Sequence, residues 1–368
     1  MAEYTPLKDA YDQAYIDRLA LTIKAACPDF DAKDFKKIIF ADAWDDLELK
    51  ARMERIAEVI DLLLPQDLSA AFAVVDQVVE NFDGYMAMFF PAFVEIRGLK
   101  NVEANWDLTV SALARYTGHS SSEFAVRPFI TSNPSKMMSQ MLTWANHEDH
   151  HVRRLASEGC RPRLPWAMAL PALKKDPTPI LPILEVLCAD DSEYVRRSVA
   201  NNLNDISKDH PDLVLKIAEK WLGEAPESQD RKRLVKHACR TLLKAGNSQA
   251  LLLFGFRDPA TIEVSELTLD RELVKIGEKI EFGFVVSGKP DLGKLRIEYV
   301  VHFHKKNGQL RGKIFQLSEF ESGEKSRTFR RKHSFKDLST RRHYPGAHEI
   351  AVIVNGIEKA RICFELKA

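Results

Sequence analysis

The chain has 368 residues, and its 53 Lys and Arg side chains balance 53 Asp and Glu side chains. This length exceeds what one hydrophobic core usually organises, so we expect two domains. No run of about 18 apolar residues occurs, which excludes a membrane-spanning helix, and the first residues lack the basic and apolar regions of an export signal.

Residues 1–150 are acidic, with 14 Lys and Arg against 24 Asp and Glu. Apolar residues recur there at helical spacing, as in "ARMERIAEVIDLLL" and "LSAAFAVVDQVVENF", and predict amphipathic helices separated by short turns. The histidines of "NHEDHH" are spaced poorly for a metal site, and a solvated helix start is the favoured interpretation. The five cysteines form no CxxC pair, which is typical of reduced thiols in a cytosolic protein.

A repeat begins near residue 150. The segments "HHVRRLASEG" and "EYVRRSVANN" align with Val152 over Val195, an offset of 43, and "RLVKHACRTL" follows with Leu234 at a further offset of 39. Such periods are typical of stacked helical hairpins of the HEAT type. We therefore predict that residues 1–258 form an α-solenoid of HEAT-like helical repeats, curved and right-handed.

The repeat predicts a polar ladder along successive helices. A spacing of four residues places Arg197, Asn201 and Asp205 on one helix face, away from the apolar stripe. The aligned positions are Arg154 and Glu158 in the preceding helix and Lys236, Arg240 and Lys244 in the following one. Asp205 is expected to face an open groove, and it sits in the last helical turn, where the helix dipole disfavours an anion. This placement favours a functional role, whereas ordinary solvated helix faces are the alternative.

From residue 259 the apolar pattern alternates. The segments "KIEFGFVVSG", "KLRIEYVVHFH" and "HEIAVIVNGIEKARICFEL" predict strands, the last containing a hairpin turn at Asn355 and Gly356. Residues 259–368 are therefore expected to form an all-β immunoglobulin-like sandwich. Basic residues cluster near its expected strand ends and loops, where they would contact a polyanion or, alternatively, protect an edge strand.

Three segments carry a family resemblance: "SSSEFAVRPFI", "RRLASEGCRPRLPW" and "YVRRSVANNLNDISKDHPD". They resemble the AlkC branch of the AlkC/AlkD family of bacterial DNA glycosylases, and the resemblance extends over nearly the whole chain. It implies a monomeric cytoplasmic, nucleoid-associated enzyme of base excision repair that acts on double-stranded DNA. The implied reaction is hydrolysis of the N-glycosidic bond of cationic bases such as 3-methyladenine and 3-methylcytosine. Residues 1–258 would form the glycosylase domain and residues 259–368 a DNA-contacting domain.

The resemblance also implies the catalytic residues, namely Glu123, Glu158, Asp205 and Trp166. A base methylated on a ring nitrogen is already cationic, so it leaves without a general acid. A carboxylate would then stabilise the oxocarbenium-like sugar and orient the attacking water, and an aromatic face would hold the cation. For Glu123, a capping box begun by Ser120 is the alternative, and for Trp166 the alternative is a core anchor, as we expect for the other four tryptophans.

The basic side chains are expected to hold DNA phosphates on either side of the lesion. They are Arg154, Arg161, Arg163, Arg197, Lys236, Arg240, Lys244, Lys305, Lys306, Arg311, Arg330 and Arg331. No metal or other cofactor is needed for this chemistry. A non-catalytic HEAT-repeat scaffold that binds protein or nucleic acid, or a relative that binds DNA without excision, fits the repeat and the basic surface equally well. The lesion range, the roles of the two ladder acids and base flipping stay open.

Overall fold

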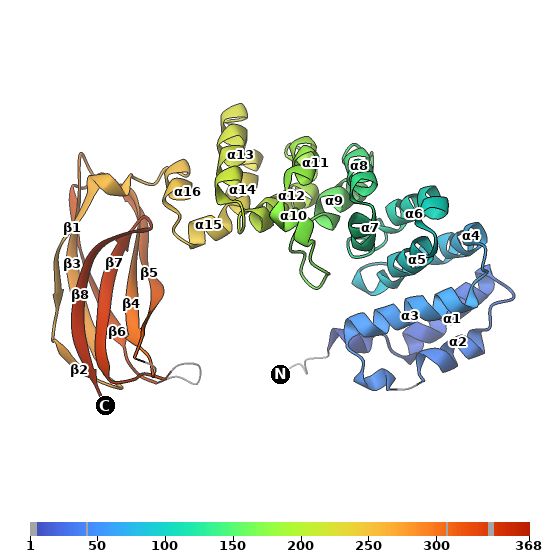
Figure 1. Ribbon diagram of the computed structural model, residues 1–368, viewed down its shortest axis with the longest axis horizontal. Coiled ribbons are helices and arrows are strands. Elements are labelled where there is room, and N and C mark those ends of the chain that lie inside the picture. Colours follow the sequence, from blue (N-terminus) through green and yellow to red (C-terminus); the bar gives the residue numbers. More distant parts are fainter. Residues whose placement is uncertain (1–5, 42, 307, 338–341) are drawn as a thin grey trace. The chain divides into compact units, whose positions relative to one another are not determined.

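A computed structural model describes residues 6–41, 43–306, 308–337 and 342–368. The described residues form helices up to Leu253 and strands from Ile262 onward, as the change of apolar pattern predicts (Figure 1). Their contacts divide the chain into two compact units. The first unit contains the residues up to His210 together with Glu227–Ala238, and the second contains Pro211–Pro226 and Cys239–Ala368.

The first unit is helical. Its helices are α1 (Gln13–Ala26), α2 (Ala32–Ile39), α3 (Leu49–Leu63), α4 (Leu68–Val79), α5 (Phe89–Lys100), α6 (Val102–Tyr116), α7 (Arg127–Ser132), α8 (Pro134–Trp144), α9 (His150–Gly159), α10 (Pro171–Lys175), α11 (Leu181–Leu187), α12 (Glu193–Ile206) and α14 (Gln229–Ala238). Short 3₁₀ helices are η1 (Leu7–Ala10), η2 (Trp44–Asp46), η3 (Tyr85–Ala87) and η4 (Thr178–Ile180). None of the helices in the described ranges is long and apolar enough to cross a bilayer.

Helices α9, α12 and α14 hold the repeat. The side chains of Asp149 and Asp31 cap the starts of α9 and α2, as expected for aspartate at an N-cap. The aligned residues Val152 and Val195 are both buried, and α12 packs between α9 and α14. The apolar stripe of α12 is buried over its whole length, which confirms the helical repeat at this level.

The third copy of the repeat differs from the prediction. Its helix does not run through "RLVKHACRTL" but stops at Ala238, and α15 (Arg240–Lys244) begins after Cys239. Cys239 has φ −88° and ψ 5°, a bridge-region conformation that ends the α-helical hydrogen bonding. Arg240 and Lys244 therefore lie on a different helix from Lys236, and they belong to the second unit.

The second unit joins α13 (Pro211–Glu224), α15, α16 (Ser248–Leu253) and η5 (Pro259–Thr261) to a two-sheet sandwich. Its strands are β1 (Ile262–Leu269), β2 (Leu273–Lys275), β3 (Lys279–Gly288), β4 (Gly293–His304), β5 (Leu310–Ser322), β6 (Ser326–Ser334), β7 (Gly346–Val354) and β8 (Ile357–Lys367). The sheet orders are β1-β3-β6 and β2-β8-β7-β4-β5, with only the β2–β8 pair parallel among the described strands. Their facing side chains form one apolar core.

The predicted hairpin turn is present between β7 and β8. Asn355 and Gly356 have φ of 46° and 81°, the positive values that a two-residue hairpin turn requires. A side chain at Gly356 would collide with the Gly246 carbonyl, so the turn lies tightly against the end of α15. The compact unit that contains the strands thus begins ahead of residue 259, and separate domains at 1–258 and 259–368 stay a prediction for proteolysis.

Candidate active site

The loop after α9 is held at both ends by one buried arginine. Arg127 donates from Nη1 to the carbonyl oxygens of Gly159 (2.8 Å) and Arg161 (2.9 Å), and from Nε to that of Met168 (2.7 Å). Burial lowers the pKa of Arg127 to about 10, because loss of water disfavours the charged form, so the side chain is still cationic at neutral pH. A fixed cation therefore positions the segment that contains Arg161 and Trp166.

Arg161 lies between two of the predicted catalytic acids. Its Nη1 donates to Glu158 Oε1 (2.6 Å) and its Nε donates to Asp205 Oδ2 (2.9 Å). Glu158 lies in the last turn of α9 and Asp205 in the last turn of α12, and the packing of α9 against α12 brings both carboxylates to one arginine. Burial alone would lower the pKa of Arg161, but Glu158 and Asp205 outweigh burial and raise that pKa above its ordinary value. The site therefore holds two carboxylates around one permanent cation.

One sequence-based expectation is wrong here. Asp205 does not face an open groove, because its residue is only 2% exposed. Arg161 is 7% exposed and bound to both acids, and its contact with a DNA phosphate stays a prediction. The helix dipole disfavours an anion at this end of α12, but two cations compensate the charge of Asp205. They are Arg161 and Lys208, and Lys208 Nζ lies 3.1 Å from Asp205 Oδ1.

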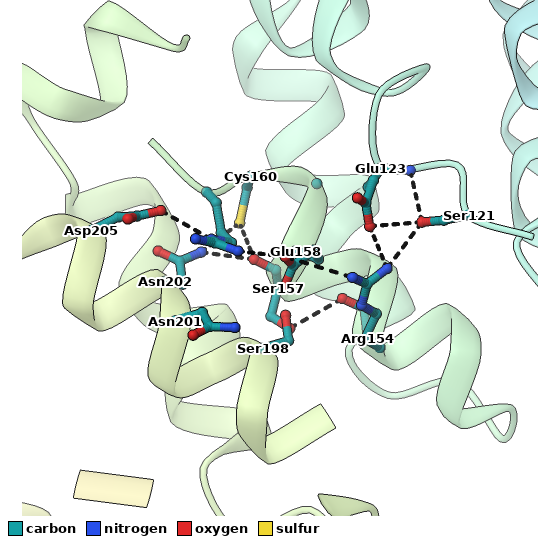
Figure 2. A network of polar contacts seen from close by, with 12 residues as sticks. Ser121, Glu123, Arg154, Ser157, Glu158, Cys160, Ser198, Asn201, Asn202 and Asp205 are labelled. Atoms are coloured by element: carbon teal, nitrogen blue, oxygen red, sulfur yellow. Dashed lines mark hydrogen bonds and ion pairs between the residues drawn. The ribbon is translucent and has the colours of Figure 1, made fainter. Parts of the chain in front are cut away.

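Glu123 joins the same network through Arg154. Arg154 Nη1 lies 2.5 Å from Glu123 Oε2, and Nη2 lies 3.6 Å from Glu158 Oε1. Ser121 Oγ accepts from Arg154 (2.9 Å) and donates to Glu123 (2.8 Å). The capping-box alternative for Glu123 is wrong, because α7 begins at Arg127 without a side-chain cap. Figure 2 shows Glu123, Arg154 and Glu158 converging from the segment before α7 and from α9.

These contacts form a sequence of alternating charges, which we name the charge chain. Its members are Glu123, Arg154, Glu158, Arg161, Asp205 and Lys208. Three carboxylates alternate with three cations, so the charge chain is neutral as a whole. A buried charge is stable only when it is paired and hydrogen-bonded, and this alternation meets that condition over the length of the site.

Uncharged polar contacts beneath the charge chain hold α9 against α12. Ser157 Oγ donates to Ser198 Oγ (2.7 Å), and Asn202 Nδ2 donates to the Ser157 carbonyl oxygen (2.8 Å) and contacts Cys160 Sγ at 3.4 Å (Figure 2). All four residues are buried. The sequence analysis missed them, although Ser157 and Ser198 are small polar residues within the buried faces of α9 and α12.

The side chain of Trp166 is exposed to solvent and is not part of the hydrophobic core. It is 71% exposed, whereas the other four tryptophans are buried as expected, namely Trp44, Trp106, Trp144 and Trp221. Its φ is +64°, a conformation that costs a bulky residue about 1–3 kcal/mol. The Tyr85 ring meets it edge-on at 5.9 Å between centroids, and the pKa of Tyr85 is raised by burial and by the nearby Glu123 carboxylate. An aromatic surface therefore lies on the Glu123 side of the charge chain.

The predicted phosphate contacts occupy different positions. Arg197 is exposed beside a hollow of about 440 Å³ that Arg154, Glu158, Tyr194 and Asn201 also line. Lys236 is exposed on α14. Arg163 instead donates to both oxygens of Asp209, at 2.8 Å and 3.0 Å.

In the second unit the basic residues are mainly on edge strands rather than in loops. Arg311 lies on β5, and Arg330 and Arg331 lie on β6, each strand being the outer one of its sheet, and all three side chains are exposed. Lys305 and Lys306 directly follow β4. Edge strands need charge for protection, so these positions alone do not separate DNA contact from solubility.

The histidine cluster is closer to a metal-site geometry than its spacing indicates. Asp149, His150 and His151 each offer a ligand atom, and these atoms lie within 4.8 Å of one another. They surround the amino end of α9, where the positive helix end and Arg153 and Arg154 disfavour a further cation. Asp149 also caps the helix through His151 N at 2.8 Å, so a helix start explains the cluster.

Comparison with known proteins gives two family matches. The family described as "DNA alkylation repair enzyme" matches residues 105–242, and the one described as "Uncharacterised protein YhaZ, C-terminal Ig-like domain" matches residues 263–368. "Uncharacterized protein YhaZ" of Bacillus subtilis (strain 168) is 43% identical over 361 residues, which cover 98% of this chain and 99% of that one. The structure of Pseudomonas fluorescens alkylpurine DNA glycosylase AlkC, bound to DNA containing an abasic site analog, is 34% identical. It covers 99% of this chain and 100% of that chain, with a TM-score of 0.79.

Proposed function

Because the chain belongs to the DNA alkylation repair enzyme family, in its AlkC branch with a C-terminal immunoglobulin-like domain, we propose that it is a DNA glycosylase for cationic alkylated bases. The proposed substrates are 3-methyladenine and 3-methylcytosine in duplex DNA, and the proposed active form is a monomer. The observation that supports this most is the charge chain, which holds the buried carboxylates of Glu158 and Asp205 together with the partly buried carboxylate of Glu123.

The proposed reaction replaces a bond to the base with a bond to water. The bond between C1′ and the base nitrogen breaks, and its electron pair neutralises the cationic base, which leaves. Positive charge then develops on the sugar, where a fixed carboxylate stabilises it. Water attacks C1′, and a carboxylate accepts the proton that the water releases. No metal ion takes part in this scheme.

We assign the central role to Asp205. Its Oδ2 is fixed by Arg161 and its Oδ1 contacts only the flexible ammonium of Lys208 among the described residues, so one face of this carboxylate can become available. Glu158 holds the other side of Arg161 and keeps it in place. Arg161 therefore acts as a positioning residue and not as a phosphate contact. Glu123 is assigned the adjoining end of the site through Arg154.

Trp166 is assigned to the cationic nucleotide. Its exposed indole offers a face for a cation–π contact, which is worth about 0.5–2 kcal/mol depending on exposure. Arg197 and Lys236 are assigned to DNA phosphates from the first unit, and the basic residues of β5 and β6 and after β4 are assigned to them from the second.

An excision assay tests the function. Duplexes carrying 3-methyladenine, 3-methylcytosine or 7-methylguanine are incubated with excess protein, and the released base is measured against spontaneous loss. We expect release of the first two by the wild-type chain. DNA binding without release of any of the three bases would contradict catalysis and favour a DNA-binding scaffold.

A further inference from the structure

Lys208 ends the charge chain at the surface. Its Nζ lies 3.1 Å from Asp205 Oδ1, and its side chain is 39% exposed, whereas that of Asp205 is 3% exposed. Lys208 follows the last residue of α12 by two positions. One buried carboxylate is therefore connected to solvent by a single lysine.

The two cations that contact Asp205 differ in what holds them. Arg161 is buried and also bound to Glu158, so moving it would leave two carboxylates without their partner. Lys208 contacts one carboxylate among the described residues, and its flexible stem reaches water. Lys208 can therefore leave Asp205 for another partner. The buried Asp205 carboxylate still keeps one cation, because Arg161 stays bound to it.

We propose that Lys208 binds a phosphate of the DNA backbone and releases Asp205 when it does so. In the DNA-free protein the lysine neutralises Asp205, and in the complex a phosphodiester takes the lysine. The charge chain then carries one net negative charge at Asp205, at the moment when the cationic nucleotide arrives. The role of this exchange in catalysis rests on the proposed function. The contact between Lys208 and a phosphate can be tested by DNA binding alone, without excision.

The alternation of charge gives the physical reason for such an exchange. Six groups of balanced charge make a neutral site, which does not repel the DNA backbone during association. A permanently free carboxylate would repel it. Arg163, a partly exposed arginine, is held by both oxygens of Asp209, whereas Lys208 is held by one carboxylate contact among the described residues.

A double-mutant cycle on DNA binding tests the proposal. The variants are Lys208→Met, Asp205→Asn and their combination, with an undamaged duplex as probe and affinity measured over a range of salt concentrations. K208M should weaken binding and reduce the slope of log K against log salt by about 0.9, the value expected for one phosphate. D205N should tighten binding about threefold to fivefold in the wild-type background, because it removes the lysine's competing partner, and less than twofold in the K208M background.

Two further variants control the cycle. Lys36→Met removes a lysine of nearly the same side-chain exposure (38%) that is paired with Asp17 at 2.8 Å, and it should leave the salt slope unchanged. Lys208→Arg keeps the charge and should restore the slope. Thermal melting of every variant verifies folding.

An unchanged salt slope for K208M overturns the phosphate contact. Equal tightening by D205N in both backgrounds overturns the exchange, because it would reflect general repulsion between Asp205 and DNA. Failure of the wild-type chain to excise any base would instead reject the proposed function. The double-mutant cycle would still test the phosphate contact of Lys208, because it measures DNA binding and not excision.

Discussion

The charge chain of the first unit and the edge strands of the second unit use positive charge in opposite ways. In the charge chain of the first unit, Arg154 and Arg161 are largely buried and each contacts two carboxylates. On β5 and β6 of the second unit, Arg311 and Arg330 are exposed on edge strands. Buried, paired charges fix geometry and respond little to salt, whereas exposed charges act at a distance and are screened. The comparison predicts that changes at the buried members of the charge chain affect chemistry and that changes on these edge strands affect binding.

The largest expected effect is on chemistry. Changing Asp205 to Asn keeps the size of the side chain but removes the negative charge that faces the developing cation. The single-turnover rate of 3-methyladenine excision should fall about 100-fold or more, the scale of losing one preorganised electrostatic group. Because Asp205 is buried against Arg161, we also expect a lower melting temperature, so the assay must run well below it.

Asp209→Asn is the matched control for this change. Asp209 lies in the same segment and pairs with Arg163, but it is not a member of the charge chain. Its variant should excise at nearly the wild-type rate. Wild-type excision by D205N, after correction for spontaneous base loss, would remove Asp205 from catalysis.

The second effect is on binding and tests the other half of the comparison. Replacing Lys305, Lys306, Arg330 and Arg331 together with Ala should weaken DNA binding for every sequence and reduce the salt slope by roughly 0.9 for each phosphate that is no longer bound. The excision rate at saturating protein is the second reading. A lower excision rate with an unchanged salt slope would show that these residues affect chemistry and not DNA binding. No change in either quantity would support the alternative, in which these residues only protect edge strands.

The repeat predicts much of the site, and particular residues show where prediction stops. A spacing of 43 aligns Val152 with Val195 and Glu158 with Asn201, and Asp205 follows Asn201 by about one turn on the same face, because the helix period alone decides which residues share a face. Spacing does not decide whether the polar end of that face is covered. The loop that carries Arg161 covers the polar end of this face, and Arg127 holds the loop there through hydrogen bonds to its carbonyl groups. Hydrogen bonds to backbone carbonyl groups cannot be predicted from a sequence pattern.

The third effect concerns Trp166 and separates strain from function. Changing Trp166 to Gly removes the indole and relieves a positive φ, so stability should rise by up to about 1 kcal/mol. Excision should nevertheless fall about tenfold, because the cation is deprived of an aromatic face worth about 1.4 kcal/mol in a partly desolvated site. Met168→Ala, a change at an exposed neighbour, is the control. Excision that stays level in W166G would show that the exposed indole is not used.

The smallest effect concerns pH and belongs to the second unit alone. His348 is fully buried, and burial lowers its pKa below the ordinary value, against a smaller opposing effect of its hydrogen bond to the Gly346 carbonyl oxygen. Nδ1 lies 2.9 Å from that oxygen and Nε2 lies 3.3 Å from His304 N, so the neutral ring with a proton on Nδ1 satisfies both contacts. A second proton would occupy Nε2 and break the contact with His304.

The sign of the effect follows from the two states of His348. Unfolded, it takes up a proton near pH 6.5, and folded, it does so only at lower pH, so the unfolded chain binds more protons below about 6.5. The contribution of neutral His348 to the free energy of unfolding is therefore complete above that pH and is lost as pH falls below it. The free energy of unfolding changes by no more than about 1.4 kcal/mol per pH unit for one proton. Hydrogen exchange of the β7 and β8 amides in the full chain, expressed as protection factors, should decline from pH 7.5 to 5.5. His348→Asn, which keeps a donor near Gly346 but does not titrate, should flatten the decline, whereas an equal decline in both chains would assign it to other groups.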